Sequence, residues 1–339
     1  MRNKTVVVTG SNGFIGKILV QYLLDQGYGV VGIDRKNENA IVKKPNWIEY
    51  PGSFHDNQDF LDRIKHLYTA GELYGIVHLA ADSLLGPSVD NPIPYFKNNV
   101  SNSIEFVDFL IKNDIRVPFI FASSAAVYGN PVKRCASEND SLKPINPYGR
   151  TKLQFEEFLE EVSQAHYWPT TSFRFFNVIG SYQNKNGEWF SQDDNQPHVL
   201  ASMLRAIKNN ETFFIHGNQY ATPDGTTIRD YIDVQDVCWY IENELNDFNE
   251  LNDFSACVDD QTHYPINLGN CKPVSLLQLV RLVEFVLGKN IETMFGPIRP
   301  GDPDRLLADI TRLIDHYDRL PQISLEQSIR NTLTAKGLI

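Results

Sequence analysis

The sequence has few cationic side chains and no long apolar run. Lys and Arg number 31 against 42 Asp and Glu, which gives a formal net charge of −11 over 339 residues. Nucleic acids and anionic membranes bind basic surfaces, so this balance argues against both as partners. No apolar run is long enough to span a bilayer. The chain passes directly into a strand-like segment at residues 5–9, and we therefore expect no signal peptide.

Cysteine is also scarce. The four cysteines are widely spaced and none has a neighbour at the short spacing of a metal site; they are Cys135, Cys238, Cys257 and Cys271. This pattern favours reduced thiols in a cytoplasmic protein, and we expect no bound metal. The 42% of apolar residues is ordinary for a globular protein and is enough for a large core divided between two lobes.

The N-terminal segment has the order strand, glycine turn, helix. Residues 6–9 read Val-Val-Val-Thr, and residues 10–16 follow with the spacing G-x-x-G-x-x-G. An apolar stripe of helical period then runs to Gly27. Such a turn brings the backbone close to a pyrophosphate, which also meets the free N–H groups of the helix N-terminus. A glycine turn in an α/β protein that binds no nucleotide is the alternative.

A carboxylate stands at the end of the next strand. Residues 29–33 form the strand and Asp34 follows, in the position that holds the ribose diol of NAD and repels a 2′-phosphate. The adjacent Arg35 and Lys36 leave NADP as the alternative. The sequence favours NAD.

Strands and helices continue to alternate along the first half of the chain. Residues 57–70 and 95–112 have helical periodicity, whereas 76–81 and 117–121 are typical of buried strands. We interpret His78, which lies inside an apolar run, as a core histidine. The alternation predicts a parallel, doubly wound sheet. In such sheets ligands bind at the carboxyl ends of the strands, where Ser123 and Ser124 follow the last of these segments.

Residues 146–152 read Asn-Pro-Tyr-Gly-Arg-Thr-Lys and begin another predicted helix. Pro147 suits the first helical turn, and Tyr148 and Lys152 are then neighbours on one face. A free tyrosine has a pKa near ~10, and an ammonium one turn away favours the phenolate. The pair can therefore accept a proton from a hydroxyl group. A half-buried tyrosine beside a solvated lysine is the alternative.

With the glycine turn, Ser123-Ser124-Ala125 and Tyr148-x-x-x-Lys152 in this order, the chain resembles the extended short-chain dehydrogenase/reductases. Residues 222–232 read Thr-Pro-Asp-Gly-Thr-Thr-Ile-Arg-Asp-Tyr-Ile and resemble a long stretch of the UDP-galactose 4-epimerases. The segments at 173–177, 267–269 and 299–302 are similar to further parts of those enzymes.

The resemblance implies an α/β fold, with a Rossmann-type NAD-binding domain and a smaller C-terminal lobe that binds a UDP-sugar. Residues 1–176 and 230–268 would form the first, and residues 177–229 and 269–339 the second. It implies NAD-dependent 4-epimerisation of a UDP-hexose through a transient 4-keto sugar. The catalytic residues would be Ser124, Tyr148 and Lys152. The NAD-binding residues would be Gly10, Asn12, Gly13, Phe14, Ile15, Gly16, Asp34, Ser53, Phe54, Leu79, Ala80, Ala81, Asn99, Tyr148, Lys152 and Phe176. The UDP-sugar would contact Ser124, Asn177, His198, Val199, Arg229, Arg299, Asp302 and Leu306.

The chain departs from the resembling enzymes at several positions. Ser53 replaces an aspartate expected to face the adenine, Ser83 replaces a frequent lysine, and Asp233 replaces a common histidine. Residues 181–196 predict neither strand nor helix and could form a lid or a surface loop. Residues 242–264 are longer and more acidic than this connection requires.

Three other functions are weighed against this one. Epimerisation of a UDP-N-acetylhexosamine or UDP-hexuronate differs only in the shape of the sugar pocket. A sugar-nucleotide dehydratase needs an Asp-Glu pair where Ala125-Ala126 stand here. A non-catalytic NAD sensor predicts a disrupted tyrosine–lysine pair. The resemblance also implies a homodimer joined through the helices near 95–112 and 148–163, with Phe106, Phe109, Phe155 and Phe158 as contacts.

Overall fold

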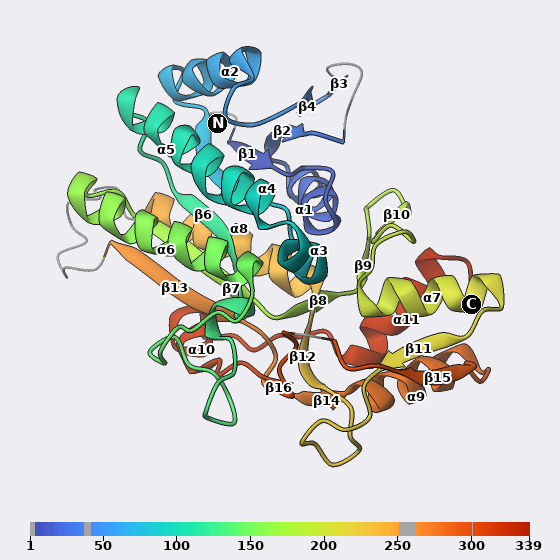
Figure 1. The fold of residues 1–339 in the computed structure, drawn as a ribbon. Coiled ribbons are helices and arrows are strands. Elements are labelled where there is room, and N and C mark those ends of the chain that lie inside the picture. The colour runs from blue at the N-terminus through green and yellow to red at the C-terminus, as the bar shows by residue number, and fades with distance from the viewer. Residues whose placement is uncertain (1–3, 37–41, 251–261, 300) are drawn as a thin grey trace.

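The computed structural model describes residues 4–36, 42–250, 262–299 and 301–339, and its centre is a twisted sheet of eight strands (Figure 1). The strand order across it is β13-β7-β6-β5-β1-β2-β4-β3. Its strands are β1 (Thr5–Thr9), β2 (Gly29–Asp34), β3 (Val42–Lys44), β4 (Trp47–Pro51), β5 (Leu73–His78), β6 (Phe119–Ser124), β7 (Thr170–Phe175) and β13 (His263–Leu268). Neighbouring strands are parallel except β3, which is antiparallel to β4. The predicted α/β fold with a doubly wound parallel sheet is confirmed.

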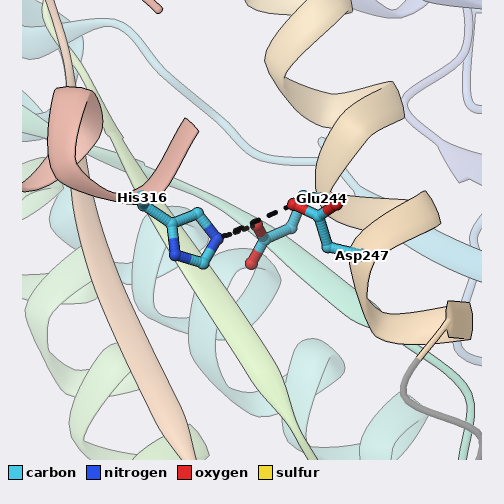
Figure 2. Close-up of side chains that lie close together, drawn as sticks. All are labelled: Glu244, Asp247 and His316. Carbon is cyan, nitrogen blue, oxygen red and sulfur yellow. Dashed lines mark hydrogen bonds and ion pairs between the residues drawn. The ribbon is translucent and has the colours of Figure 1, made fainter. Parts of the chain in front are cut away.

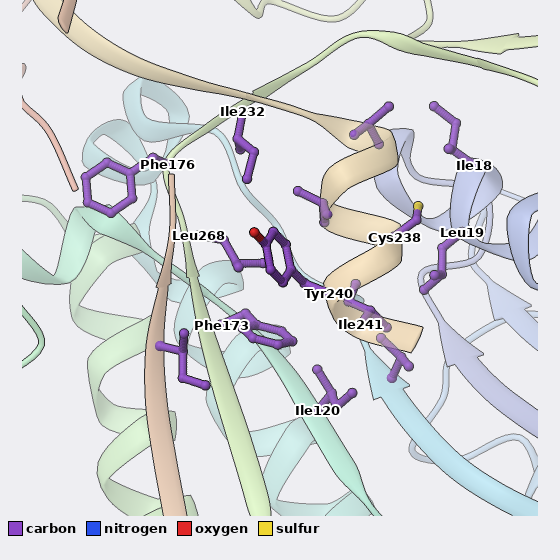
Figure 3. Packing of buried hydrophobic residues seen from close by; sticks show 14 of the residues in the cluster. Ile18, Leu19, Ile120, Phe173, Phe176, Ile232, Cys238, Tyr240, Ile241 and Leu268 are labelled. Atoms are coloured by element: carbon purple, nitrogen blue, oxygen red, sulfur yellow. The ribbon is translucent and has the colours of Figure 1, made fainter. Parts of the chain in front are cut away.

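Helices cover both faces of this sheet, so its central strands are buried on both sides, as all five residues of β1 show. The helices α1 (Phe14–Asp25) and α8 (Val234–Glu250) pack on one face, where Ile18 and Ile241 contribute to the same buried cluster as Ile120 and Phe173 of the sheet (Figure 3). The opposite face is covered by α2 (Gln58–Thr69), α5 (Asn102–Lys112) and α6 (Pro147–His166). The predicted helix start at Pro147 is confirmed.

The helix predicted over 95–112 is divided in three. A short helix α4 (Pro92–Phe96) follows α3 (Leu85–Asp90), a π-helical turn spans Lys97–Ser101, and α5 then begins at Asn102. The wide turn places Asn98 and Asn99 in the interior. Buried polar side chains at this point interrupt the regular helix, and apolar periodicity alone did not indicate the interruption.

The C-terminal part of the chain has a hydrophobic cluster of its own. Its helices are α7 (Val199–Asn209), α9 (Leu276–Leu287) and α11 (Leu325–Ala335), beside the parallel pair β11 (Phe213–His216) and β15 (Thr293–Gly296) (Figure 1). Met203, Ile215, Val283 and Leu333 lie at the centre of this cluster. A small sheet, in which β12 (Ile228–Asp233) pairs with β8 (Asn177–Ile179), β14 (Pro273–Ser275) and β16 (Arg305–Leu306), connects it to the large sheet. The helix α10 (Thr311–Tyr317) lies beside β13.

Residues 181–196 contain a hairpin that the sequence did not predict. Strands β9 (Ser181–Gln183) and β10 (Trp189–Ser191) pair antiparallel and pack against α1 and α11. Strands of three residues are too short to show an alternating pattern. Of residues 242–264, the first part completes α8, the last begins β13, and 251–261 lie outside the described residues.

Two of the four predicted dimer contacts are wrong. Phe106 and Phe155 are fully buried within one chain, in the aromatic cluster around His78. Each helix needs this apolar side to cover its own sheet. Phe109 and Phe158 are only half-buried. Separately, no helix among the described residues is long and apolar enough to cross a membrane.

Candidate active site

A cleft of about 1600 Å³ lies at the carboxyl ends of the parallel strands and extends to the C-terminal cluster. Sites for one drug-sized ligand measure ~300–1,000 Å³, so this cleft has room for two ligands end to end. The predicted cofactor and substrate residues line it, with three exceptions: Asn12, Ser53 and Asn99. Segments far apart in the sequence therefore meet at one place.

The glycine turn leaves no room for side chains. A Cβ atom on Gly16 would lie 2.0 Å from the carbonyl oxygen of Gly10, and one on Gly10 would lie 2.8 Å from the Ala80 nitrogen. Gly10 also has a positive φ of 72°, which glycine adopts without strain. The α1 N-terminus that follows has no side-chain cap. Its unpaired N–H groups are thus available to an anion in the cleft.

Asp34 is fixed by the backbone at the same end of the cleft. Its Oδ2 accepts the Asn12 N–H at 2.9 Å, and its Oδ1 accepts the Lys36 N–H at 2.8 Å. Next to it, Arg35 forms an ion pair of 2.9 Å with Asp82. A carboxylate at the end of β2 and an uncapped helix N-terminus together fit a dinucleotide with a free ribose diol.

The three exceptions support the wall of the cleft instead. The backbone N–H of Asn12 donates a hydrogen bond to Asp34, and the Ser53 hydroxyl hydrogen-bonds His55 at 2.8 Å. The Asn99 amide accepts the Asp82 N–H and donates to the Asp82 carbonyl oxygen, at 2.8 and 2.9 Å. It thereby holds the turn after β5 against the wide turn before α5.

Tyr148, Lys152 and Ser124 meet in the middle of the cleft. The Asn146 side chain caps α6 by accepting the Gly149 N–H at 2.8 Å, which directs the first helical turn into the cleft. Lys152 Nζ donates to the Ala122 carbonyl oxygen at 2.7 Å and lies 5.8 Å from the centre of the Tyr148 ring. Ser124 stands at the end of β6, where it hydrogen-bonds Tyr148.

Burial has the largest effect on the pKa values of Tyr148 and Lys152. It raises the pKa of Tyr148 to about 12, against a smaller lowering by the hydrogen bond from Ser124. Burial lowers the pKa of Lys152 to about 7, although Glu156 and Asp82 act in the opposite direction. The phenol is therefore protonated at neutral pH. The expected lowering of the tyrosine pKa by Lys152 is not seen here.

The other end of the cleft carries the predicted sugar-nucleotide residues. Arg229 Nη2 forms an ion pair of 2.6 Å with Asp302, and Arg299 is exposed beside them. Leu306 of β16 pairs in register with Arg229 of β12 and lines the cleft, whereas the next residue, Leu307, is buried in the core. Of these two leucines, only Leu306 lines the cleft.

Comparisons with known proteins identify the family and the fold. Residues 6–247 match the NAD dependent epimerase/dehydratase family. The chain belongs to this family. It is 32% identical over 307 residues to the UDP-glucose 4-epimerase of Halalkalibacterium halodurans, covering 89% of this chain and 86% of that protein. The UDP-glucose 4-epimerase of Bifidobacterium longum, solved with NAD+ and UDP, superposes with a TM-score of 0.84 and 25% identity over 98% of both chains. A UDP-N-acetylglucosamine 4-epimerase from Methanobrevibacter ruminantium M1, solved with UDP-N-acetylmuramic acid, superposes with a TM-score of 0.80 and 26% identity, covering 99% of both chains.

Several cleft residues of this epimerase/dehydratase family member were not predicted. Asp82 directly follows the predicted Ala80-Ala81 pair, so its place at a strand end could have indicated it. Gln192 and His216 come from segments that share no pattern with the rest of the site. His216 has a pKa lowered by burial and by the nearby Arg299.

Two histidines outside the cleft are structural. His78 is a core histidine, as predicted: Nδ1 bonds Thr9 Oγ1 at 2.8 Å and Nε2 bonds Ser103 Oγ at 3.0 Å. Burial lowers its pKa to about 3. His316 lies near Glu244 and Asp247 of α8 (Figure 2).

Glu244, Asp247 and His316 are spaced like metal ligands, but protein donors already occupy Glu244. Its carboxylate accepts hydrogen bonds from Thr171 and Tyr317, and from His316 Nε2 at 3.1 Å. His316 lies 4.0 Å from Asp247. We therefore describe the group as an ion-pair network that ties α8 to α10.

Proposed function

We propose that the protein interconverts UDP-glucose and UDP-galactose by inverting the configuration at C4 of the sugar, with NAD as its cofactor. The observation that carries the proposal is the position of Tyr148. It stands beside Ser124 in the middle of one cleft, with Asp34 at one end and Arg229 at the other. A dinucleotide and a sugar nucleotide bound from opposite ends would meet at the tyrosine.

The residues at the first end fit NAD. The uncapped N-terminus of α1 suits a pyrophosphate, and the Asp34 carboxylate suits a ribose diol. When bound, NAD supplies the acceptor to which the C4 hydride passes and from which it returns. The cofactor is regenerated in each turnover, so the reaction does not require its release.

The residues of the protein transfer the proton of the sugar 4-hydroxyl and bind the UDP part of the substrate. Tyr148 acts as general base in its deprotonated form. After losing its own proton to solvent, the phenolate accepts the proton of the sugar 4-hydroxyl and returns it after the 4-keto sugar has turned over. Ser124 hydrogen-bonds the reacting oxygen. Lys152, in its protonated form, stabilises the negative charge of the Tyr148 phenolate. The arginines Arg229 and Arg299 suit a diphosphate, which stays bound while the sugar turns.

Other UDP-sugars are the second candidate substrates. One structural neighbour is a UDP-N-acetylglucosamine 4-epimerase, and the same catalytic residues would serve that reaction. Leu306 lines the cleft. Placed beside the sugar, it would favour the unsubstituted hexoses because it fills volume without offering a hydrogen bond to an acetamide. A dehydratase is disfavoured, since Ala125-Ala126 provide no acid for the elimination.

The test is incubation with a panel of UDP-sugars and NAD, with the products resolved by chromatography. We expect UDP-glucose and UDP-galactose to interconvert, and the N-acetylated and uronic acid pairs to react more slowly. Conversion of only an N-acetylated or uronic acid pair would replace the proposed substrate. If none of the UDP-sugars were converted, epimerase activity would be refuted.

Three further assignments belong to this proposal. The NAD-binding domain comprises 1–176 and 230–268, supported by the place of α8 and β13 on the large sheet. The remaining residues form the UDP-sugar lobe, supported by the hydrophobic cluster that α7, α9 and α11 share. The protein acts in the cytoplasm, which the wide spacing of its four cysteines favours.

The protein also forms a homodimer through α5 and α6. Phe109 and Phe158 pack against the cluster beneath these helices but are only half-buried, which leaves part of each ring for a partner. Exposed Val89 and Ile93 on the neighbouring α3 and α4 would extend this surface. Light scattering at micromolar concentration should give twice the chain mass; the mass of one chain would refute the dimer.

A further inference from the structure

Residues 192–196, here called the strap, cross from the cofactor end of the cleft to the C-terminal cluster. They connect β10 to α7, and Gln192 and Gln196 line the cleft. The sequence predicted no structure for this segment, and the proposed reaction gives it no part.

The strap is held on the cofactor side by one carboxylate. Asp193 forms ion pairs with Lys17 of α1 and with Lys36, the latter at 3.7 Å. Lys17 directly follows Gly16 of the glycine turn, and the Lys36 N–H binds the Asp34 carboxylate. Burial acts to raise the pKa of Asp193, but these lysines hold it below its usual value, so the carboxylate stays charged.

On the other side the strap is tied to the C-terminal cluster. Asp194 forms ion pairs of 2.7 Å with Lys208 of α7 and 2.6 Å with Lys336 beyond α11. Lys336 also donates to the Gln192 carbonyl oxygen at 2.5 Å. The hairpin before the strap adds the Tyr182 hydroxyl, which donates to Asp25 of α1 at 2.7 Å. Asp193 is thus the charged link between the strap itself and the cofactor end.

We propose that Asp193 is a positioning residue that closes the strap over the cofactor end of the cleft and slows release of the bound dinucleotide. The inference rests on the proposed use of NAD. A dinucleotide leaving between the glycine turn and Asp34 has to displace the strap, which breaks the ion pairs of Asp193 with Lys17 and Lys36. A reaction that regenerates its cofactor loses nothing from slow release.

The test measures release of bound NADH, followed by its fluorescence after mixing with excess NAD. In Asp193→Asn we expect release to be about three- to tenfold faster, the range for two partly exposed ion pairs. Asp193→Glu keeps the charge and should restore slow release. Asp108→Asn is the matched control, because it removes an exposed carboxylate paired at 2.6 Å with Lys112 on α5. It should leave release unchanged.

Three further measurements distinguish the ion pairs of Asp193 from a general loss of stability. The kcat for UDP-galactose at saturating NAD should stay within about twofold in Asp193→Asn, because chemistry does not need cofactor release. Salt raised from ~0.05 to ~0.5 M should accelerate release in the wild type much more than in Asp193→Asn. A double variant with Lys17→Gln should release NADH no faster than the faster single variant.

Unchanged release in Asp193→Asn, equal acceleration in Asp108→Asn, or additive effects of Lys17→Gln and Asp193→Asn would each overturn the role of Asp193. In those cases NADH still binds and the proposed function stands. A wild-type protein that binds no NADH or NAD would instead refute the cofactor assignment, and this inference with it.

Discussion

Glu156 of α6 and Arg174 of β7 form an ion pair of 2.7 Å that is almost completely buried. The carboxylate also receives the Arg174 Nε–H and the Ser123 hydroxyl. Glu156 stands one helical turn after Lys152, and Arg174 pairs in register with Ser123 of β6. The pair therefore fixes α6 against β6, which ends in Ser124, and β7.

Removal of either charge should destabilise the fold. Glu156→Gln leaves the Arg174 guanidinium buried without a counter-charge, which typically costs ~3–5 kcal/mol. The free energy of unfolding from urea titration would measure the loss. Asp108→Asn, which breaks an exposed ion pair, should change it by less than ~1 kcal/mol. A loss of similar size in both variants would contradict the structural role of the buried pair.

The ion-pair network of His316 makes part of the stability depend on pH. The hydrogen bond to Glu244 raises the pKa of His316, against burial, and Asp247 adds to the effect. A histidine whose pKa is raised by folding contributes stability fully below its unfolded pKa of ~6.5 and loses it as pH rises through the folded pKa. The melting temperature should thus fall in His316→Asn by more at pH ~6 than at pH ~9.

The same substitution at the exposed His66 of α2 is the matched control and should show no such difference between the two pH values. A His316→Asn effect that is equal at both, or larger at the higher pH, would mean that the charged imidazole does not stabilise the link between α8 and α10.

Much of the fold followed from local sequence patterns. Residues 5–34 predicted β1, the glycine turn, α1 and β2 because each step has its own local signal. Pro147 and the apolar stripe after it located α6. The cleft brings together Asp34 and Tyr148, since parallel strands place their carboxyl ends at one edge of a sheet.

Other features depend on contacts between distant segments, which no local pattern records. Apolar residues on α5 and α6 did not reveal which side faces the sheet, so Phe106 and Phe155 were misplaced at a dimer surface. Spacing placed Lys152 near Tyr148 but gave no measure of burial, which dominates the pKa of both. Asp193 meets Lys17 only after the chain has folded.

Leu306 should determine which sugars are accepted. An acetamide turned towards it would leave polar atoms unpaired, at ~1–3 kcal/mol or about ten- to hundredfold in kcat/KM. We expect Leu306→Ser to raise kcat/KM for UDP-N-acetylglucosamine relative to UDP-glucose. The matched variant Leu307→Ser changes a core residue and should lower stability without this change in preference. Equal wild-type efficiencies for the two sugars, or an unchanged preference in Leu306→Ser, would remove Leu306 as the determinant.

Asp34 should determine the choice of cofactor. Loss of its carboxylate in Asp34→Ala removes charge-assisted hydrogen bonds worth ~1.5–3 kcal/mol, so the Kd for NAD should rise about ten- to hundredfold. The Kd for NADP should change less, since repulsion of its phosphate is lost together with the hydrogen bonds. Titration of the purified protein with each cofactor measures both constants. Tighter wild-type binding of NADP than of NAD would contradict this role.

The Tyr148→Phe variant shows whether Tyr148 is the general base of 4-epimerisation. The substitution removes the hydroxyl that takes the sugar proton and keeps the ring that fills the cleft wall. Wild-type protein with NAD should convert UDP-galactose to UDP-glucose, as followed by chromatography, and the variant should be slower by ~10²–10⁴-fold with an unchanged melting temperature. A folded Tyr148→Phe protein that retains more than about a tenth of wild-type conversion would contradict the assignment of Tyr148 as the base.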